Sequence, residues 1–226
     1  MGIVATTPLA GQVVLITGAS RGIGAALAVA LAAEGAHLCL VARGAADLTR
    51  VQAACAAAAG ERDARCITIV ADITRPADCE RIVAQCREVL GGRIDVLCNN
   101  AGIAPSGALA NCEPAELAAA VACNVHAPML LSRLVLPDML RRGGGTIVNM
   151  SSVCVWCCLL RALCRMHPSL IALLACSCGL MAIPGMAVYC ATKAALNSFT
   201  IALRAELKVR LGVLRRVLLA RCCSCC

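Results

Sequence analysis

The stretch Gly18-Ala19-Ser20-Arg21-Gly22-Ile23-Gly24 follows the apolar run Val13–Thr17 and precedes Ala25–Glu34, a run of good helix formers. A glycine-rich turn between a strand and a helix lets backbone N–H groups meet a pyrophosphate at the positive end of the helix, where glycine avoids a side-chain clash. This order therefore predicts a dinucleotide site at residues 18–24. The alternative is that the three glycines only close a tight turn.

Strand and helix patterns alternate outward from this turn. The expected strands are Val13–Thr17, Leu38–Val41, Cys66–Ala71, Ile94–Cys98 and Thr146–Met150. The expected helices are Ala25–Glu34, Asp47–Ala59, Pro76–Leu90 and Pro114–Leu140, the last with breaks near Pro128 and Pro137, followed by a later helix that opens at Tyr189–Lys193. Apolar strands without polar alternation predict a parallel sheet covered by helices on both faces. The expected fold class is α/β, a doubly wound parallel sheet in a single domain over residues 1–226.

Composition narrows the classes of function. The chain has 226 residues, of which 60% are apolar, so one domain with an ample core is expected. One Trp, one Tyr and one Phe argue against a protein that stacks nucleic-acid bases on aromatic rings. Six of the eight net positive charges lie in residues 154–178 and 209–226, which hold arginines and no acids. The remaining +2 does not indicate a nucleic-acid or membrane partner.

The cysteines and histidines predict neither a disulfide framework nor a metal site. Ten of the 19 cysteines lie in the same two segments, and the others are scattered among apolar positions, where free cysteine behaves as a small hydrophobe. This usage favours a reducing compartment, so a cytoplasmic protein is expected. The three histidines, His37, His126 and His167, share no ligand spacing. The apolar run over residues 169–183 is shorter than the ~18 residues that span a bilayer.

Three further motifs follow the glycine-rich turn. Asn99-Asn100-Ala101-Gly102 comes after the fourth expected strand, Ser151-Ser152 ends the fifth, and Tyr189-Cys190-Ala191-Thr192-Lys193 opens the later helix. Residues four apart share one face of a helix, so the Lys193 ammonium would favour tyrosinate and lower the pKa of Tyr189 toward neutrality. Tyr189 would then act as a general acid in carbonyl reduction and as a base in alcohol oxidation. Ser152 would donate a hydrogen bond to the substrate oxygen.

With these four ordered motifs, the chain resembles the short-chain dehydrogenase/reductase family from about Leu9 to Lys208. The resemblance implies a Rossmann-like fold and a homo-oligomer. It also implies that Lys193 holds the nicotinamide ribose and that Asn124 orders a water beside this lysine, although Asn124 could instead cap a helix break. The expected catalytic residues are Asn124, Ser152, Tyr189 and Lys193.

The end of the second expected strand indicates which cofactor is preferred. Relatives that prefer NAD place an acid there, whereas this chain has Ala42 followed by Arg43. Arg43 and Arg21 would fit the 2′-phosphate of NADP(H), unless both are solvated surface charges. Asp72 matches the family position beside adenine or caps the end of a strand, and Asn99 is expected to link strands. The expected cofactor-binding residues are Gly18, Ser20, Arg21, Gly22, Ile23, Gly24, Arg43, Asp72, Asn100, Ala101, Gly102, Tyr189 and Lys193.

Two segments depart from the family pattern. Ser152 and Tyr189 lie 37 positions apart, and the excess is an insertion at residues 154–178 that is expected to loop out so that the two side chains can meet. After Lys208 the last strands of the family are not recognisable, so the C-terminal strands are expected to be incomplete, with an atypical tail at residues 209–226. Their shared composition suggests the hypothesis that both segments are translated intron sequence. A zinc site and a lipid-dipping hairpin are the alternatives.

The sequence therefore predicts an NADP-dependent oxidoreductase that transfers a hydride between nicotinamide and a ketone or secondary alcohol. The alternative is a non-catalytic dinucleotide-binding pseudoenzyme, disabled by the insertion and by the missing strands. The expected partner is a small carbonyl or alcohol substrate, with no nucleic acid and no membrane, and the atypical C-terminus argues against the homo-oligomer. The substrate cannot be named, because its pocket would be built largely from the loop after the unrecognised sixth strand.

Overall fold

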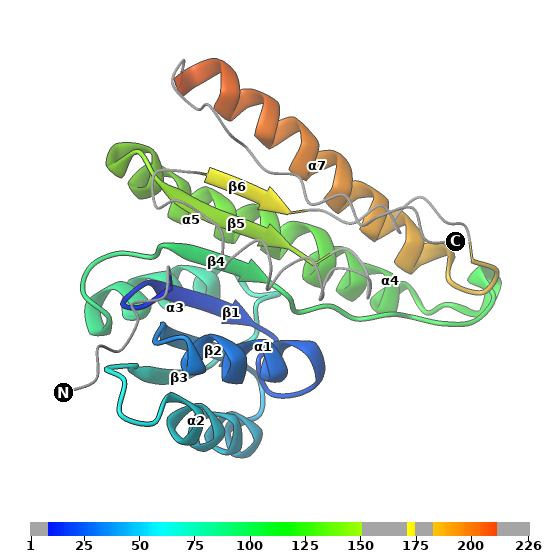
Figure 1. The fold of residues 1–226 in the computed structure, drawn as a ribbon. Coiled ribbons are helices and arrows are strands. Elements are labelled where there is room, and N and C mark those ends of the chain that lie inside the picture. The colour runs from blue at the N-terminus through cyan, green and yellow to red at the C-terminus, as the bar shows by residue number, and fades with distance from the viewer. Residues whose placement is uncertain (1–8, 151–170, 175–182, 212–226) are drawn as a thin grey trace.

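A parallel sheet forms the centre of the protein in a computed structural model that describes residues 9–150, 171–174 and 183–211 (Figure 1). The strands are β1 (Val13–Thr17), β2 (His37–Ala42), β3 (Cys66–Val70), β4 (Val96–Asn99), β5 (Gly145–Asn149) and β6 (Ile171–Leu174). Their order is β3-β2-β1-β4-β5-β6, so the direction of winding reverses between β1 and β4. The prediction of a doubly wound α/β fold is confirmed.

Helices cover both faces of the sheet. They are α1 (Gly22–Ala33), α2 (Ala45–Ala59), α3 (Pro76–Val89), α4 (Pro114–Val121), α5 (Ala127–Arg142) and α7 (Ala187–Leu211), with the short 3-10 helix η1 (Leu109–Asn111) and the π-helix η2 (Ala122–His126). Helices α1 and α2 share one apolar cluster with Val14 and Ile16 of β1. Helices α3, α5 and α7 pack on the other face, against Val13 and Leu15. Because both faces are covered, every residue of β1 is buried, which is why the strand sequences lack polar alternation.

Strand β6 corrects the expectation that residues 154–178 loop out of the fold. Ile171–Leu174 pair in parallel with β5, with Gly145 opposite Ile171 and Val148 opposite Leu174. Four consecutive apolar residues suit a strand in a parallel sheet, so the prediction is wrong for this part of the segment. The other residues of 154–178, the predicted site residue Ser152 and the tail from residue 212 onward lie outside the described residues.

The helical segment from Pro114 to Arg142 also differs from expectation. Pro137 lies inside α5, and the predicted break there is wrong, because the helix continues through it while Val135 and Met139 stay buried in the core. The irregularity expected near Pro128 is the π-helix η2, which directly precedes the first turn of α5. The whole segment is long and apolar enough to cross a membrane by length and composition alone, and 44% of its most apolar window is buried within the protein.

Buried amide side chains fasten α7 to the sheet. Asn99 Nδ2 of β4 donates to Asn149 Oδ1 of β5 at 2.8 Å, and Asn149 Nδ2 donates to Thr200 Oγ1 of α7 at 2.9 Å. All three side chains are at most 2% exposed. The expectation that Asn99 links strands is confirmed, and the same chain of bonds sets the height of α7 above β5.

Replacing Thr200 by Val should lower the free energy of unfolding by about 1–3 kcal/mol, because a buried Asn149 donor loses its acceptor while the side-chain volume is kept. Urea denaturation measures this loss. Thr200→Ser keeps the hydroxyl and is the matched control, with a smaller loss expected. Wild-type stability in the Val variant would contradict the structural role assigned to this bond.

Candidate functional site

The glycine-rich turn between β1 and α1 lies directly against the loop that follows β4. Gly18 adopts a φ of +65°, and a Cβ atom added there would come within 2.8 Å of the Ala101 Cα. A Cβ on Gly24 would clash with the Gly18 carbonyl oxygen and would lie 2.5 Å from Asn100 Nδ2. Only glycine allows the two loops to approach so closely. Gly22, at a φ of +57°, has open space where its side chain would be.

Hydrogen bonds from Thr17 and Asn100 join these two loops. The Thr17 hydroxyl oxygen accepts from the backbone N–H groups of Asn100 and Ala101, both at 3.1 Å. In return, Asn100 Nδ2 donates to the carbonyl oxygens of Thr17 and Gly18 at 2.9 and 3.1 Å. The turn and the loop therefore form one unit at the carboxyl ends of β1 and β4. In doubly wound sheets this reversal of strand order is where ligands bind.

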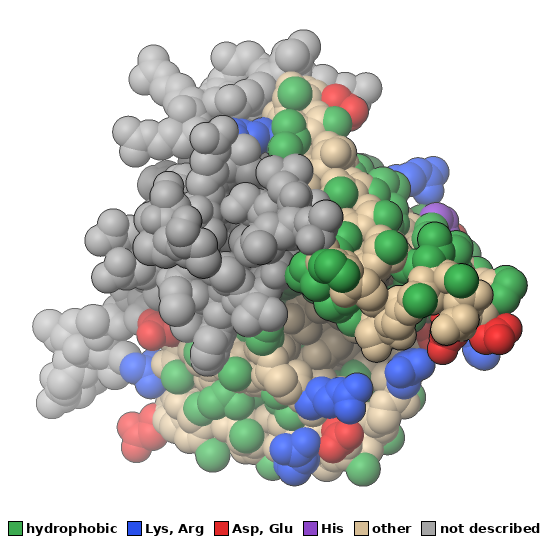
Figure 2. Space-filling view, turned by 90° about the vertical axis from the view of Figure 1, so that its right-hand side faces the viewer, with side chains coloured by type: hydrophobic (Ala, Val, Ile, Leu, Met, Phe, Trp, Pro, Cys, Tyr) green, Lys and Arg blue, Asp and Glu red, His purple; other side chains and the backbone are tan. Residues whose placement is uncertain are grey.

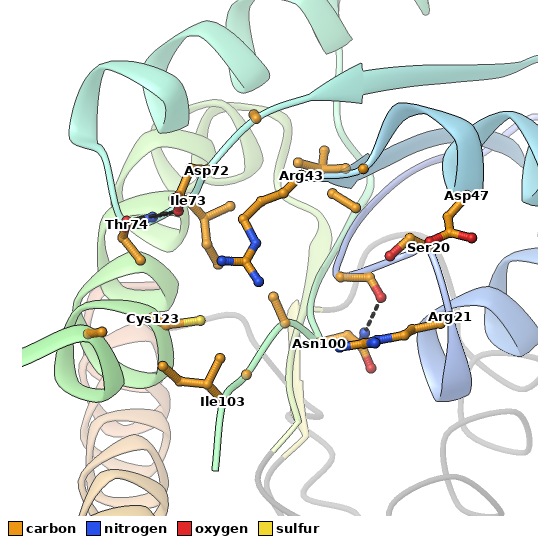
Figure 3. A pocket seen from close by; sticks show the side chains of 18 of the residues that line it. Ser20, Arg21, Arg43, Asp47, Asp72, Ile73, Thr74, Asn100, Ile103 and Cys123 are labelled. Carbon is orange, nitrogen blue, oxygen red and sulfur yellow. Dashed lines mark hydrogen bonds between the residues drawn. The ribbon is translucent and has the colours of Figure 1, made fainter. Parts of the chain in front are cut away.

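A cavity of about 590 Å³ opens at this edge of the sheet (Figure 3). Its volume lies within the usual range for ligand and cofactor sites. The predicted cofactor-binding residues that line it are Gly18, Ser20, Arg21, Ile23, Arg43, Asp72, Asn100, Ala101 and Gly102. Gly22 and Gly24 shape the turn without lining the cavity, and Tyr189 and Lys193, which were also predicted to bind the cofactor, are not among the lining residues.

Charged side chains lie on the walls of the cavity. In Figure 3, Arg43 extends between Asp72 and Asn100, and Arg21 lies beside Asn100. The backbone N–H of Thr74 donates to Asp72 Oδ1 at 3.0 Å, and this bond, with a smaller contribution from Arg43, lowers the pKa of Asp72. Asp72 therefore caps the turn after β3 and also faces the cavity as a carboxylate. Figure 2 looks onto the carboxyl ends of the strands, where basic and acidic side chains both reach the surface.

Tyr189 and Lys193 come together in the first turns of α7, as predicted. Lys193 Nζ lies 5.6 Å from the centre of the Tyr189 ring and donates to the Met150 carbonyl oxygen at 2.8 Å. A Cβ added to Gly102 would lie 3.4 Å from Nζ, so the lysine borders the cavity wall. Lys193 is only 5% exposed, and burial lowers its pKa to about 8.

Asn124 uses its side chain to connect the loop after β4 with α7. It lies buried in η2, where its Oδ1 accepts from the Ile103 N–H at 2.9 Å. Its Nδ2 donates to the Ile103 carbonyl oxygen at 2.7 Å and to Thr192 Oγ1 at 3.0 Å. Both donor hydrogens of the amide are thus used within the protein. To order a water beside Lys193, as predicted, Asn124 would have to use its acceptor oxygens instead of these hydrogens.

The structure adds site residues that the sequence reasoning missed. Thr74, Ile103 and Cys123 line the cavity, and Thr192 contacts Asn124. Burial raises the pKa of the Cys123 thiol, and the nearby Lys193 ammonium opposes this. The only sequence signal for Cys123 and Thr192 was their position next to Asn124 and Lys193. Within residues 9–150, 171–174 and 183–211, no group of three or more His, Cys, Asp or Glu side chains is placed to hold a metal ion.

The model of the family described as short chain dehydrogenase matches residues 12–156, which is more than half of the chain. The protein belongs to the short-chain dehydrogenase/reductase family. It is 42% identical over 147 residues to the ketoacyl reductase HetN of Nostoc sp., a match that covers 65% of this chain and 50% of that protein. It is 37% identical over 200 residues to 11-beta-hydroxysteroid dehydrogenase 1A of Arabidopsis thaliana, covering 88% and 49%. The chain thus spans about half the length of these curated relatives.

Solved short-chain dehydrogenase/reductase structures share the fold. A metagenomic short-chain oxidoreductase in complex with NADP matches with a TM-score of 0.74 and 29% identity, over 95% of this chain and 82% of that one. Levodione reductase matches with a TM-score of 0.69 and 30% identity, over 90% and 67%. The family identified from the four sequence motifs is confirmed.

The buried lysine makes stability depend on pH in a specific direction. The folded chain binds the Lys193 proton with a pKa of about 8 instead of the ordinary 10.5. Between these values the unfolded chain binds more protons than the folded chain, so raising the pH through this window stabilises the fold. Below pH 8 the lysine is charged in both the folded and the unfolded chain, and burial of this charge then lowers the free energy of unfolding by about 3 kcal/mol.

Lys193→Met should therefore raise the free energy of unfolding at pH 7 by about 2 kcal/mol, since losing the bond to the Met150 carbonyl returns about 1 kcal/mol of the gain. The gain should shrink as the pH rises from 8 toward 10.5. Urea denaturation of both proteins across this range measures it. A Met variant less stable than wild type at pH 7 would show that the ammonium contributes more through its contacts than its burial costs.

Proposed function

We propose that this protein is an NADP(H)-dependent oxidoreductase that transfers a hydride between nicotinamide and a ketone or secondary alcohol. The observation that carries the proposal is the placement of Lys193, which lies 5.6 Å from the centre of the Tyr189 ring, next to Gly102 in the wall of a cavity that the glycine-rich turn helps to line. Membership of an oxidoreductase family supports the class of reaction.

The residues at the cavity fit a dinucleotide. The first turn of α1 carries no acidic side chain, and the space beside Gly22, the first residue of the helix, is open. A pyrophosphate would therefore meet backbone N–H groups there without repulsion. Arg43 and Arg21 would bind the 2′-phosphate through charge-assisted hydrogen bonds. Asp72 would lie beside the adenine, and the backbone of Asn100, Ala101 and Gly102 would contact the cofactor along the cavity wall. Bound NADP(H) would supply or accept the hydride.

The proton of the reaction would be handled by Tyr189. In the direction of reduction its hydroxyl would donate to the carbonyl oxygen, and in the direction of oxidation the tyrosinate would take the proton from the alcohol. The Lys193 ammonium would favour the tyrosinate electrostatically. With a pKa of about 8, Lys193 remains mostly protonated at pH 7. Ser152, which lies outside the described residues, would donate a hydrogen bond to the same substrate oxygen.

Tyr189→Phe should lower kcat by about 10²–10⁴-fold, because it removes the proton donor while leaving the ring in place. NADPH consumption on a panel of ketones measures turnover, and fluorescence titration measures the Kd for NADPH, which should change little. The panel should begin with ketoacyl compounds and with the ketone forms of hydroxysteroids, since one relative is named a ketoacyl reductase and another an 11-beta-hydroxysteroid dehydrogenase. NADPH binding without turnover in the wild type would instead favour the non-catalytic dinucleotide-binding protein.

Arg43→Ala should weaken NADPH binding by about 10–100-fold, the loss expected for a charge-assisted contact to the 2′-phosphate, and should leave NADH binding unchanged. Arg133→Ala is the matched control for net charge, because Arg133 is an exposed residue of α5 that does not line the cavity. Titrations of both nucleotides with the three proteins decide the preference. Equal losses for NADPH and NADH in Arg43→Ala would rule out a 2′-phosphate contact.

A further inference from the structure

We propose that the hydroxyl of Thr192 is a positioning group that fixes the helix bearing Tyr189 and Lys193 to the loop lining the cofactor cavity. The proposal rests on the function proposed above, because it assigns a task within that same site. Thr192 lies between the two reacting positions in sequence, yet its side chain points away from solvent and is 3% exposed.

Both hydrogen-bonding capacities of the Thr192 hydroxyl are used. Its hydrogen is donated to the Tyr189 carbonyl oxygen at 2.8 Å, and its oxygen accepts from Asn124 Nδ2 at 3.0 Å. A hydroxyl that only bonded back to its own helix would fix nothing beyond that helix. Here the second bond leaves α7 and reaches η2, 68 positions earlier in the chain.

The contacts continue from Asn124 into the cavity wall. Asn124 holds both the N–H and the carbonyl oxygen of Ile103, at 2.9 and 2.7 Å, and Ile103 lines the cavity. A continuous path of hydrogen bonds therefore runs from the backbone of Tyr189 through Thr192 and Asn124 to the loop that would support the cofactor. Every polar group on this path is buried or half-buried, where a lost partner is costly.

A second hydrogen bond holds the neighbouring residue, Lys193. Lys193 Nζ is bonded to the Met150 carbonyl oxygen at the end of β5. The start of α7 is thus held at two points, by Met150 through Lys193 and by Asn124 through Thr192. With the Thr192 bond removed, the first turns of α7 would be held by the Lys193 bond alone, because the Asn149–Thr200 bond lies further along the helix, and the Tyr189 ring could shift relative to the cavity. Displacements of about 1 Å at a reacting group can lower a rate by about 10²-fold.

The test compares Thr192→Val, which keeps the shape and removes the hydroxyl, with Thr192→Ser, which keeps the hydroxyl. Tyr189 is the only tyrosine in the chain, so a titration of tyrosinate absorbance in the full-length protein reports on this residue alone. The titratable neighbours Lys193 and Cys123 are retained in both variants. The Val variant should shift the Tyr189 titration toward that of a free tyrosine and lower kcat about tenfold or more, and Ser should restore both.

Outcomes for the two proposals remain distinguishable. If the wild type binds no NADPH or reduces no ketone, the proposed function fails, and the titration still tests Thr192. An unchanged Tyr189 titration in Thr192→Val, or a Ser variant as impaired as the Val variant, overturns the positioning role. Thermal unfolding of each variant confirms that the compared proteins are folded.

Discussion

The close contact between the glycine-rich turn and the loop after β4 is the constraint on which the rest of the site depends. Asn100 and Ala101 donate four hydrogen bonds across it to oxygens of Thr17 and Gly18, and glycine at positions 18 and 24 makes the approach sterically possible. The turn and the loop joined by this contact both line the cavity, and Gly102 of the same loop lies beside Lys193. The polar groups of this contact are satisfied by one another, so the contact needs no further hydrogen-bond partner.

Lys193, which would assist the proposed reaction, lowers the stability of the folded protein. An ammonium buried beside Tyr189 costs folding free energy, and its hydrogen bond to the Met150 carbonyl oxygen offsets part of this cost. A purely structural helix would place an apolar side chain at position 193. The lysine is therefore better explained by the chemistry proposed for it than by packing.

Local sequence features predicted most of the fold and the site, and contacts over long range account for what was missed. Strand β1 was predicted with its observed bounds because a strand buried on both faces has an unbroken apolar pattern. Strand β6 was not predicted, because its place depends on register with β5, and its segment departs from the family spacing. Likewise, Tyr189 and Lys193 lie in a recognisable motif, whereas the role of Thr192 depends on a partner in η2 that no local pattern reveals.

Hydrogen exchange of the full-length protein with and without NADPH tests the central claim most directly, which is that the glycine-rich turn and the loop after β4 together hold one dinucleotide. Saturating NADPH should slow the exchange of backbone amides in residues 18–24 and 100–103 together, because both segments line or shape the cavity. The distant loop between α2 and β3 should be unaffected. Unchanged exchange in both segments, or protection confined to another part of the chain, would contradict the assignment of this site.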